Sequence, residues 1–190
     1  MRPRRLEFSA FGPYAGDEVV DFDALSDFGL FVVSGPTGSG KSSIFNALCF
    51  ALYGVFPGEF SGDRYVRSQH AAAETPCVVS LEFQAGGEQW KVTRRTAFER
   101  PKKRGEGTRT VAAEATLARY EHDEWSVKSS KIAAVNDRCE ELVGLDSEQF
   151  QRVVLLPQGG FARVLNASVN DRRMLLRKLF SSSRFDRTVE

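Results

Sequence analysis

Alternating apolar and polar residues near the amino terminus predict two neighbouring β-strands. In residues 4–11, Leu6 and Phe8 fall on one face while charged residues fall on the other, which is the period-two pattern of a half-buried strand. Residues 16–22 alternate in the same way, and the Gly- and Pro-containing segment 12–16 supplies the turn between them. We therefore expect an antiparallel layer at this end of the chain.

The same alternation returns in the middle of the chain. Apolar residues occupy every second position in 77–83, 90–92 and 111–117. The Ala-Gly-Gly-Glu turn at 85–88 joins the first two segments into a hairpin, and the loop 99–107 precedes the third. These strands extend the expected antiparallel layer.

Two continuous apolar runs predict strands buried on both faces. Residues 29–34 read Gly-Leu-Phe-Val-Val-Ser and residues 153–156 read Val-Val-Leu-Leu. Uninterrupted apolar runs are typical of parallel strands covered by helices. The predicted fold class is therefore α/β, with a mixed sheet that has a parallel core and an antiparallel β layer beside it.

Apolar residues at helical spacing predict helices between and after these strands. Residues 41–53 form the first helix, which Gly54 is placed to end. The next helix begins after a cap at Ser129 or Ser130 and ends at Gly144. Further helices are expected after Asp146 and after Asn170, the second with an apolar face set among arginines.

The composition is that of a globular domain. Of the 190 residues, 42% are hydrophobic and 27% are charged, with a net charge of +1, so neither disorder nor an overall basic surface is indicated. The lone cysteines Cys49, Cys77 and Cys139 argue against a disulfide framework or a zinc site. With no apolar run of membrane-spanning length and no signal peptide, we expect a soluble, cytoplasmic protein with no membrane partner.

The strongest motif lies between the first apolar run and the first long helix. It has the pattern Gly, four free positions, Gly, Lys, Ser, which defines a phosphate-binding P-loop. The residues expected to bind nucleotide are Gly35, Pro36, Thr37, Gly38, Ser39, Gly40, Lys41, Ser42 and Ser43. Glycines let consecutive backbone N–H groups turn inward, so that they form an anion nest at the positive end of a helix.

Two side chains of this loop have expected roles. Lys41 is placed to reach the β- and γ-phosphates, and the Ser42 hydroxyl is placed to ligate Mg²⁺. The acid that normally shares this metal is missing, because no apolar run ends in Asp-Asp or Asp-Glu. No Asn-Lys-x-Asp segment of the kind that reads guanine is present either. The chain therefore has the features of half an active site.

The most basic local segment is the loop 99–107, which contains Lys102, Lys103 and Arg104 and follows Arg94 and Arg95. One hypothesis is that it grips a nucleic-acid phosphate backbone without reading sequence. Glutamates interleaved with these cations favour the alternative, a solvated hairpin tip.

Several segments together resemble the SbcC family of bacterial DNA-repair ATPases, in the family's order over nearly the whole chain. Besides the P-loop, they are Ala10-Phe11-Gly12-Pro13-Tyr14-Ala15, Trp90-Lys91-Val92-Thr93-Arg94-Arg95, Glu124-Trp125, Ser129-Ser130-Lys131-Ile132, Leu155-Leu156-Pro157-Gln158-Gly159-Gly160-Phe161-Ala162 and Leu165-Asn166-Ala167. The resemblance implies the amino-terminal lobe of an ABC-type, chromosome-maintenance-like ATPase head over residues 1–180. Residues 181–190 would begin a coiled-coil helix.

The resemblance also implies a mechanism. Gln158 would be the Q-loop glutamine, a catalytic-side residue with Lys41 that approaches Mg²⁺ and the γ-phosphate. A carboxyl-terminal lobe would supply the Walker B acids, the signature motif and the switch histidine. Two such heads would dimerise around ATP, bind double-stranded DNA and control the nuclease subunit SbcD, in association with the nucleoid. Gly12 stands where archaeal and eukaryotic relatives carry an arginine, so no nucleotide contact is transferred to it.

Two other classes of function remain open from the residues. A P-loop kinase for a small molecule would need an arginine-bearing lid, for which Arg64, Arg67 and Arg100 are candidates. A nucleotide-binding scaffold would bind without turnover. The antiparallel strands and the unfinished site fit the kinase poorly.

Overall fold

The computed structural model describes residues 1–25, 29–57, 66–72, 74–102 and 106–154. The chain divides into two compact units, Met1–Gly144 and Leu145–Glu190. The helix expected after Asn170 lies outside the described residues, as does most of the second apolar run.

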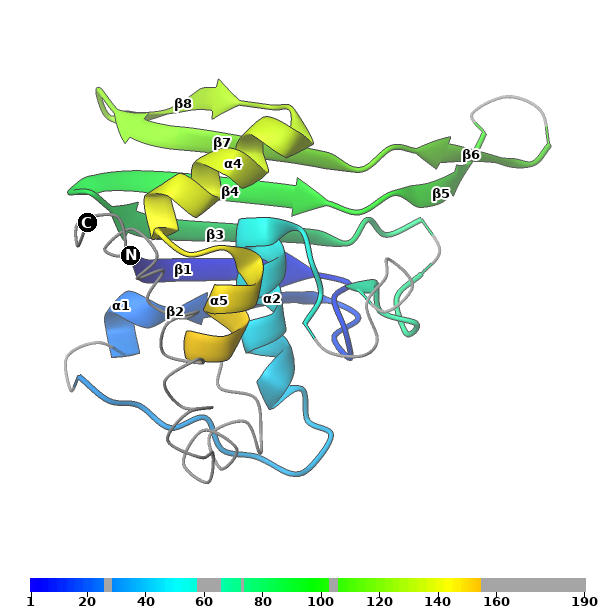
Figure 1. Cartoon of the computed structure of the whole chain (residues 1–190). Coiled ribbons are helices and arrows are strands. Elements are labelled where there is room, and N and C mark those ends of the chain that lie inside the picture. The colour runs from blue at the N-terminus through cyan, green and yellow to red at the C-terminus, as the bar shows by residue number, and fades with distance from the viewer. Residues whose placement is uncertain (26–28, 58–65, 73, 103–105, 155–190) are drawn as a thin grey trace, which may run out of the picture. The chain divides into compact units, whose positions relative to one another are not determined.

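The first unit is built on a six-stranded sheet with the strand order β2-β1-β3-β4-β7-β8 (Figure 1). Every strand pairing among the described residues is antiparallel. The bounds are β1 (Arg2–Ser9), β2 (Asp17–Asp21), β3 (Val78–Ala85), β4 (Glu88–Arg95), β7 (Glu114–Glu121) and β8 (Glu124–Ser129). The predicted antiparallel layer, its amino-terminal strand pair and its central hairpin are confirmed, whereas β8 was not predicted.

A separate two-stranded ribbon leaves this sheet between β4 and β7 (Figure 1). Its strands are β5 (Phe98–Pro101) and β6 (Thr108–Val111), paired in register from Phe98 opposite Val111 to Pro101 opposite Thr108. The loop at its tip is the most basic segment of the sequence. We call this ribbon with its loop, residues 98–111, the basic arm.

The core lies on one face of the six-stranded sheet. Leu6, Leu81, Val92 and Leu117 stand opposite one another in four adjacent strands, and all are fully buried. Burial of such side chains contributes about 1.5–3 kcal/mol each. Helices α2 (Lys41–Tyr53) and α4 (Ile132–Val143) pack on this face (Figure 1).

Both helices confirm the sequence prediction, with one change. Gly54 ends α2 and Gly144 ends α4, each in the left-handed conformation that glycine adopts without strain. The amino-terminal cap of α4 is Lys131 rather than a serine, and no side chain caps it. A short helix, α1 (Phe22–Leu25), was not predicted.

In the second unit, α5 (Ser147–Val153) begins where Asp146 predicted a helix. Asp146 and Gln149 form a reciprocal capping box, in which each side chain bonds the other residue's backbone N–H. Val153 therefore ends a helix, and Val154 follows it half exposed rather than opening a buried strand. The prediction of a strand from residue 153 is wrong at these two positions, because Val153 is the last residue of α5 and Val154 is its carboxyl-terminal cap.

The buried strand predicted over 29–34 is also wrong. Residues 30–36 have no regular secondary structure, and the sheet described above offers them no pairing. Leu30 is 87% exposed and Val32 is 89% exposed. A strand is buried only when other strands flank it, and the described pairings are all antiparallel pairings of other segments.

Arg94 is a buried cation in the core. It stands in register with Phe8, Val79 and Ala115 on the buried face, and it is 3% exposed. Its Nε donates to the carbonyl oxygen of Ala51 at 2.7 Å, and its Nη2 donates to that of Leu52 at 2.9 Å. Burial lowers the pKa of the guanidinium, and the negative end of α2 is where a cation is favoured.

The Arg94 guanidinium leaves little room for a side chain at Gly54, which ends α2. A Cβ on Gly54 would come within 3.0 Å of Arg94 Nη1. Arg94 therefore ties the last turn of α2 to the centre of the sheet.

We expect Arg94→Ala to lower the free energy of unfolding by about 2–3 kcal/mol, because it removes charged hydrogen bonds to two buried carbonyls. Urea unfolding would measure this change. Arg94→Lys should recover part of the loss, since it keeps the charge but not the planar fork. Arg109→Ala, on the exposed basic arm, is the control and should change stability by less than ~0.5 kcal/mol. Equal effects at both positions would contradict the assigned role of Arg94.

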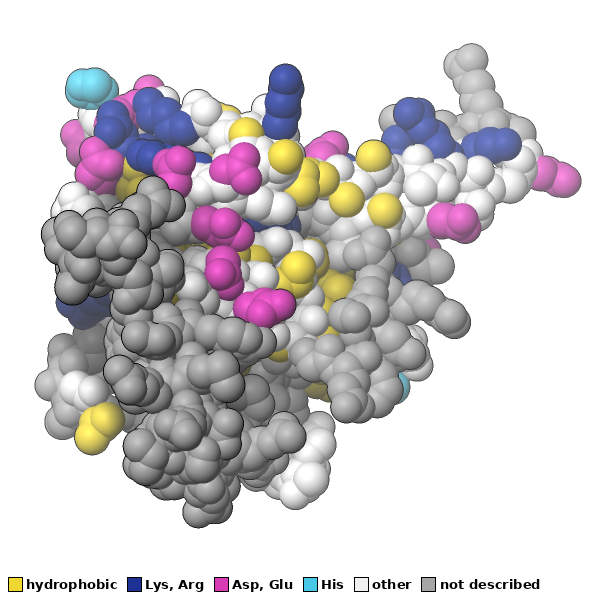
Figure 2. All heavy atoms as spheres, in the orientation of Figure 1, with side chains coloured by type: hydrophobic (Ala, Val, Ile, Leu, Met, Phe, Trp, Pro, Cys, Tyr) yellow, Lys and Arg dark blue, Asp and Glu magenta, His cyan; other side chains and the backbone are white. Residues whose placement is uncertain are grey.

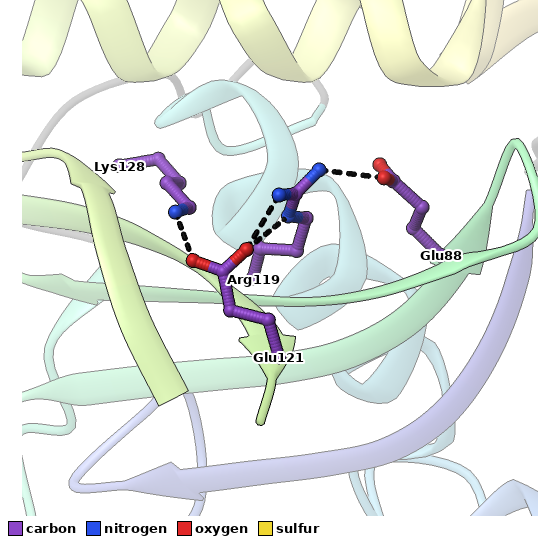
Figure 3. A network of polar contacts seen from close by, with 4 residues as sticks. All are labelled: Glu88, Arg119, Glu121 and Lys128. Carbon is purple, nitrogen blue, oxygen red and sulfur yellow. Dashed lines mark hydrogen bonds and ion pairs between the residues drawn. The ribbon is translucent and has the colours of Figure 1, made fainter. Parts of the chain in front are cut away.

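A chain of ion pairs holds the last strands together (Figure 3). Glu121 in β7 accepts from Lys128 in β8 and from Arg119 Nε at 3.0 Å, and Arg119 Nη1 also lies 2.6 Å from Glu88 in β4. The bonds from Lys128 and Arg119 lower the pKa of Glu121 from 4.5 to about 2. The edge strand β8 is thereby joined to its neighbour by charge as well as by the backbone ladder.

Because the pKa of Glu121 is depressed in the folded state, its stabilising effect is present above pH 4.5 and is lost as the pH falls toward 2. The difference in unfolding free energy between the wild type and Glu121→Gln should therefore shrink over this range. Glu124→Gln, an exposed residue of the same hairpin, should show no such trend. Urea titrations between pH 2 and 7 measure both, and a constant difference for Glu121→Gln would refute the interpretation.

Candidate nucleotide-binding site

The predicted P-loop leads directly into α2. The helix begins at Lys41, and Gly40 precedes it in the left-handed conformation with φ of 88° and no side-chain cap. Gly38 is also left-handed, with φ of 84°, so the turn needs glycine at both positions. The uncapped N–H groups of the first turn of a 13-residue helix are the ordinary setting for an anion.

Lys41 lies back over the loop. Its Nζ donates to the carbonyl oxygens of Gly35 at 2.7 Å and Pro36 at 2.6 Å, and it lies 3.4 Å from Ser39 Oγ. The ammonium group thus lies within the glycine loop that leads into α2. An ammonium beside the uncapped start of a helix suits a polyphosphate.

The next two residues complete the predicted set. The Ser42 side chain is exposed in the first turn of α2, and Ser43 donates its N–H to the carbonyl oxygen of Gly40 at 2.8 Å. A Cβ on Gly12 would come within 3.2 Å of Ser43 Oγ, so the turn after β1 lies against the start of α2. The residues present fit a phosphate group and a hydroxyl-bound Mg²⁺.

One neighbour of the loop was missed by the sequence prediction. The hydroxyl of Tyr14 lies 3.3 Å from the carbonyl oxygen of Ser39. In the sequence, Tyr14 is part of a turn between two strands, and the prediction gave it no role in the site. Only the return of that turn to the P-loop in space reveals the contact.

The other predicted site residues either lie outside the described residues or lie elsewhere in the described part of the chain. Gln158, Lys103, Arg104 and Arg64 lie outside the described residues. Lys102 lies on the basic arm, where its N–H donates to the carbonyl oxygen of Gly107. Arg67 uses its guanidinium to bond carbonyl oxygens of its own segment, including those of Ser68 at 3.2 Å and Thr75 at 3.3 Å. It is therefore occupied within the segment 67–75 rather than over the P-loop.

The three cysteines lie in the core. Cys49, Cys77 and Cys139 are free thiols in the core, and burial raises their pKa to about 12, 12 and 11. Within the described ranges, no group of three or more His, Cys, Asp or Glu side chains is arranged to hold a metal ion. None of the helices in those ranges is long and apolar enough to cross a membrane.

An antiparallel β layer that presents a glycine loop at the start of a helix defines the chain as a P-loop nucleotide-binding protein of the α/β class. The family model of the AAA domain matches residues 5–185, and the chain belongs to this family.

Individual relatives identify the chain more narrowly than the family model does. The chain is 42% identical over 183 residues to the SbcC subunit of the nuclease SbcCD from Vibrio cholerae, and the match covers 96% of this chain and 18% of that protein. It is 36% identical to the SbcC subunit of Staphylococcus saprophyticus and 34% identical to that of Lactococcus lactis, in matches that cover 98% and 96% of this chain. The resemblance to the SbcC family is confirmed.

The matched region is a small part of each relative. The chain spans 18% of the length of these SbcC subunits. Among solved structures, the SMC head domain from Thermotoga maritima matches 73% of this chain and 42% of that chain, with 20% sequence identity and a TM-score of 0.36.

Proposed function

We propose that this chain is the ATP-binding half of the ATPase head of a DNA-processing nuclease complex. The observation that carries the proposal is the glycine loop at the start of α2, with the Lys41 ammonium folded over it. The relatives, which are SbcC subunits of the nuclease SbcCD, support the nuclease context.

In this proposal the loop binds the phosphates of ATP. Backbone N–H groups of Gly38, Gly40, Lys41 and Ser42 donate to the phosphate oxygens, and Lys41 exchanges the carbonyls of Gly35 and Pro36 for the β- and γ-phosphates. Ser42 ligates Mg²⁺, which neutralises charge that develops on the phosphates. Gln158 approaches the same metal and relays the state of the nucleotide to the rest of the head.

The exposed apolar segment before the loop supports the proposal that this chain holds only part of the site. Leu30, Phe31, Val32 and Val33 are 87%, 45%, 89% and 37% exposed, and a contiguous apolar stretch of this kind marks an interaction surface. We propose that the carboxyl-terminal lobe of the same protein covers it and supplies the acid that this chain lacks. Residues 1–180 then form the amino-terminal lobe, and 181–190 begin a coiled coil.

The wider assembly follows from the same proposal. Two completed heads dimerise on ATP, which acts as a ligand with higher affinity for the engaged state. Engagement controls the nuclease subunit SbcD and the binding of double-stranded DNA, in the cytoplasm at the nucleoid. A small-molecule kinase is not favoured, because Arg67 is bonded within its own segment.

The basic arm is the surface that we propose for DNA. Arg100 stands directly opposite Arg109 in the register of β5 and β6, and like charges in that position are destabilising unless an anion joins them. Neither forms an ion pair with a described residue. Figure 2 shows basic side chains gathered over this arm.

The arginines that lead into the arm do not extend this surface. Arg94 is buried at the end of α2, and Arg95 lies 2.8 Å from Glu114. The proposed phosphate contacts are therefore Arg100, Arg109 and Lys102, together with Lys103 and Arg104, which lie outside the described residues.

We expect the 190-residue chain alone to bind ATP weakly and to hydrolyse almost none, whereas addition of the carboxyl-terminal lobe should restore turnover. The lobe supplies the missing acid, so turnover depends on it while phosphate binding does not. Isothermal titration calorimetry and a phosphate-release assay measure the two steps. Lys41→Ala is the control and should remove both. Robust hydrolysis by the chain alone would refute the half-site proposal.

For the arm, we expect Arg100→Gln with Arg109→Gln, and separately Lys102→Gln, Lys103→Gln and Arg104→Gln, to weaken DNA binding by the completed head. Each lost phosphate contact should flatten the slope of log affinity against log salt by about 0.9. Fluorescence anisotropy at several salt concentrations measures this slope. Lys131→Gln, an exposed cation outside the arm, is the control. If neither set changes affinity or slope, the arm is only a solvated hairpin.

A further inference from the structure

Tyr14 lies against the P-loop although it is distant in sequence. Its hydroxyl is 3.3 Å from the carbonyl oxygen of Ser39, at the last turn of the loop before α2. The same ring lies so close to Gly40 that a Cβ there would come within 2.7 Å of both Cζ and Oη. The phenol therefore fills the space in which a residue other than glycine would place its side chain.

Contacts with β1 and with the turn after it hold the Tyr14 ring in place. It packs edge-on against Phe8 of β1, with ring centroids 5.2 Å apart, and the Tyr14 N–H donates to the carbonyl oxygen of Phe11 at 3.0 Å. Phe11 is fully buried, and its ring lies 6.0 Å from that of Phe50 in α2.

The turn that carries Tyr14 is anchored as well. The Gly12 N–H donates to the carbonyl oxygen of Val66 at 2.9 Å, and the Ser68 N–H donates to that of Ala10 at 2.7 Å. A side chain mounted in this way is fixed relative to both β1 and α2. It contacts the P-loop as part of the sheet rather than as a free surface group.

We infer that Tyr14 is a positioning residue for the phosphate-binding loop, an inference that rests on the proposed function. Ser39 and Gly40 share one trans peptide unit, in which the carbonyl and the N–H point in opposite directions. A donor that holds the Ser39 carbonyl on one side therefore turns the Gly40 N–H to the other side. The same hydrogen bond polarises the peptide and strengthens its N–H as a donor.

The part of ATP whose binding depends on Tyr14 is the polyphosphate and not the adenine base. The peptide unit that Tyr14 holds is in the part of the P-loop that cradles phosphates. Loss of Tyr14 should therefore lower the affinities for ATP and for inorganic tripolyphosphate by the same factor. A residue that stacked on adenine would affect ATP alone.

The test compares Tyr14→Phe and Tyr14→Ala with the wild type, in the 190-residue chain with and without the carboxyl-terminal lobe. Because the hydrogen bond is long, we expect Tyr14→Phe to lower the affinity for both ligands about twofold. Tyr14→Ala, which also removes the ring, should weaken them about tenfold. Calorimetry gives both affinities, and thermal unfolding should give an unchanged Tm for Tyr14→Phe, which keeps the ring packing.

Tyr120→Phe is the matched control, because Tyr120 lies on β7 in contact with Trp125 and away from the loop. It should change neither affinity. Equal affinities for the wild type and both Tyr14 variants would overturn the inference, as would weaker binding of ATP with unchanged binding of tripolyphosphate. A wild-type chain that binds neither ligand, with and without the lobe, would overturn the proposed function itself.

Discussion

Two hydrogen bonds from Arg94 hold the last turn of α2, the helix that carries the P-loop at its other end. The helix starts at the loop and ends at a guanidinium in the middle of the sheet, which donates to Ala51 and Leu52. At its other end, the turn after β1 places Tyr14 against Ser39 and Gly40. The antiparallel sheet thus holds both ends of the element that presents the cradle, and a short loop is positioned by a rigid scaffold.

This arrangement explains why the loop is formed although the apolar segment before it is exposed. Leu30 and Val32 are almost fully exposed, yet the glycine turn after them keeps its geometry because α2 is anchored independently of that segment. In the proposed head, the two tasks are divided. The sheet and α2 prepare the phosphate site, and the second lobe covers the apolar segment and supplies the catalytic acid.

The sequence predicted the elements whose signals are local. Gly54 and Gly144 mark helix ends, the turn at 85–88 joins β3 to β4, and the Asp146 capping box opens α5. It did not predict contacts made across the fold. Arg94 looked like part of a basic surface, and only the register of β4 places it in the core. Residues 29–34 have the composition of a buried strand, but burial depends on neighbouring strands that the composition of one segment does not supply.

The proposed function depends on phosphate binding by the glycine loop at the start of α2. The most direct test is an NMR titration of the ¹⁵N-labelled chain with Mg²⁺ and ATP, which reports each backbone N–H separately. We expect saturable shifts of the amides of residues 38–43, with little change in the amides of β5 and β6. Saturation elsewhere in the chain while the amides of residues 38–43 stay unshifted would contradict it.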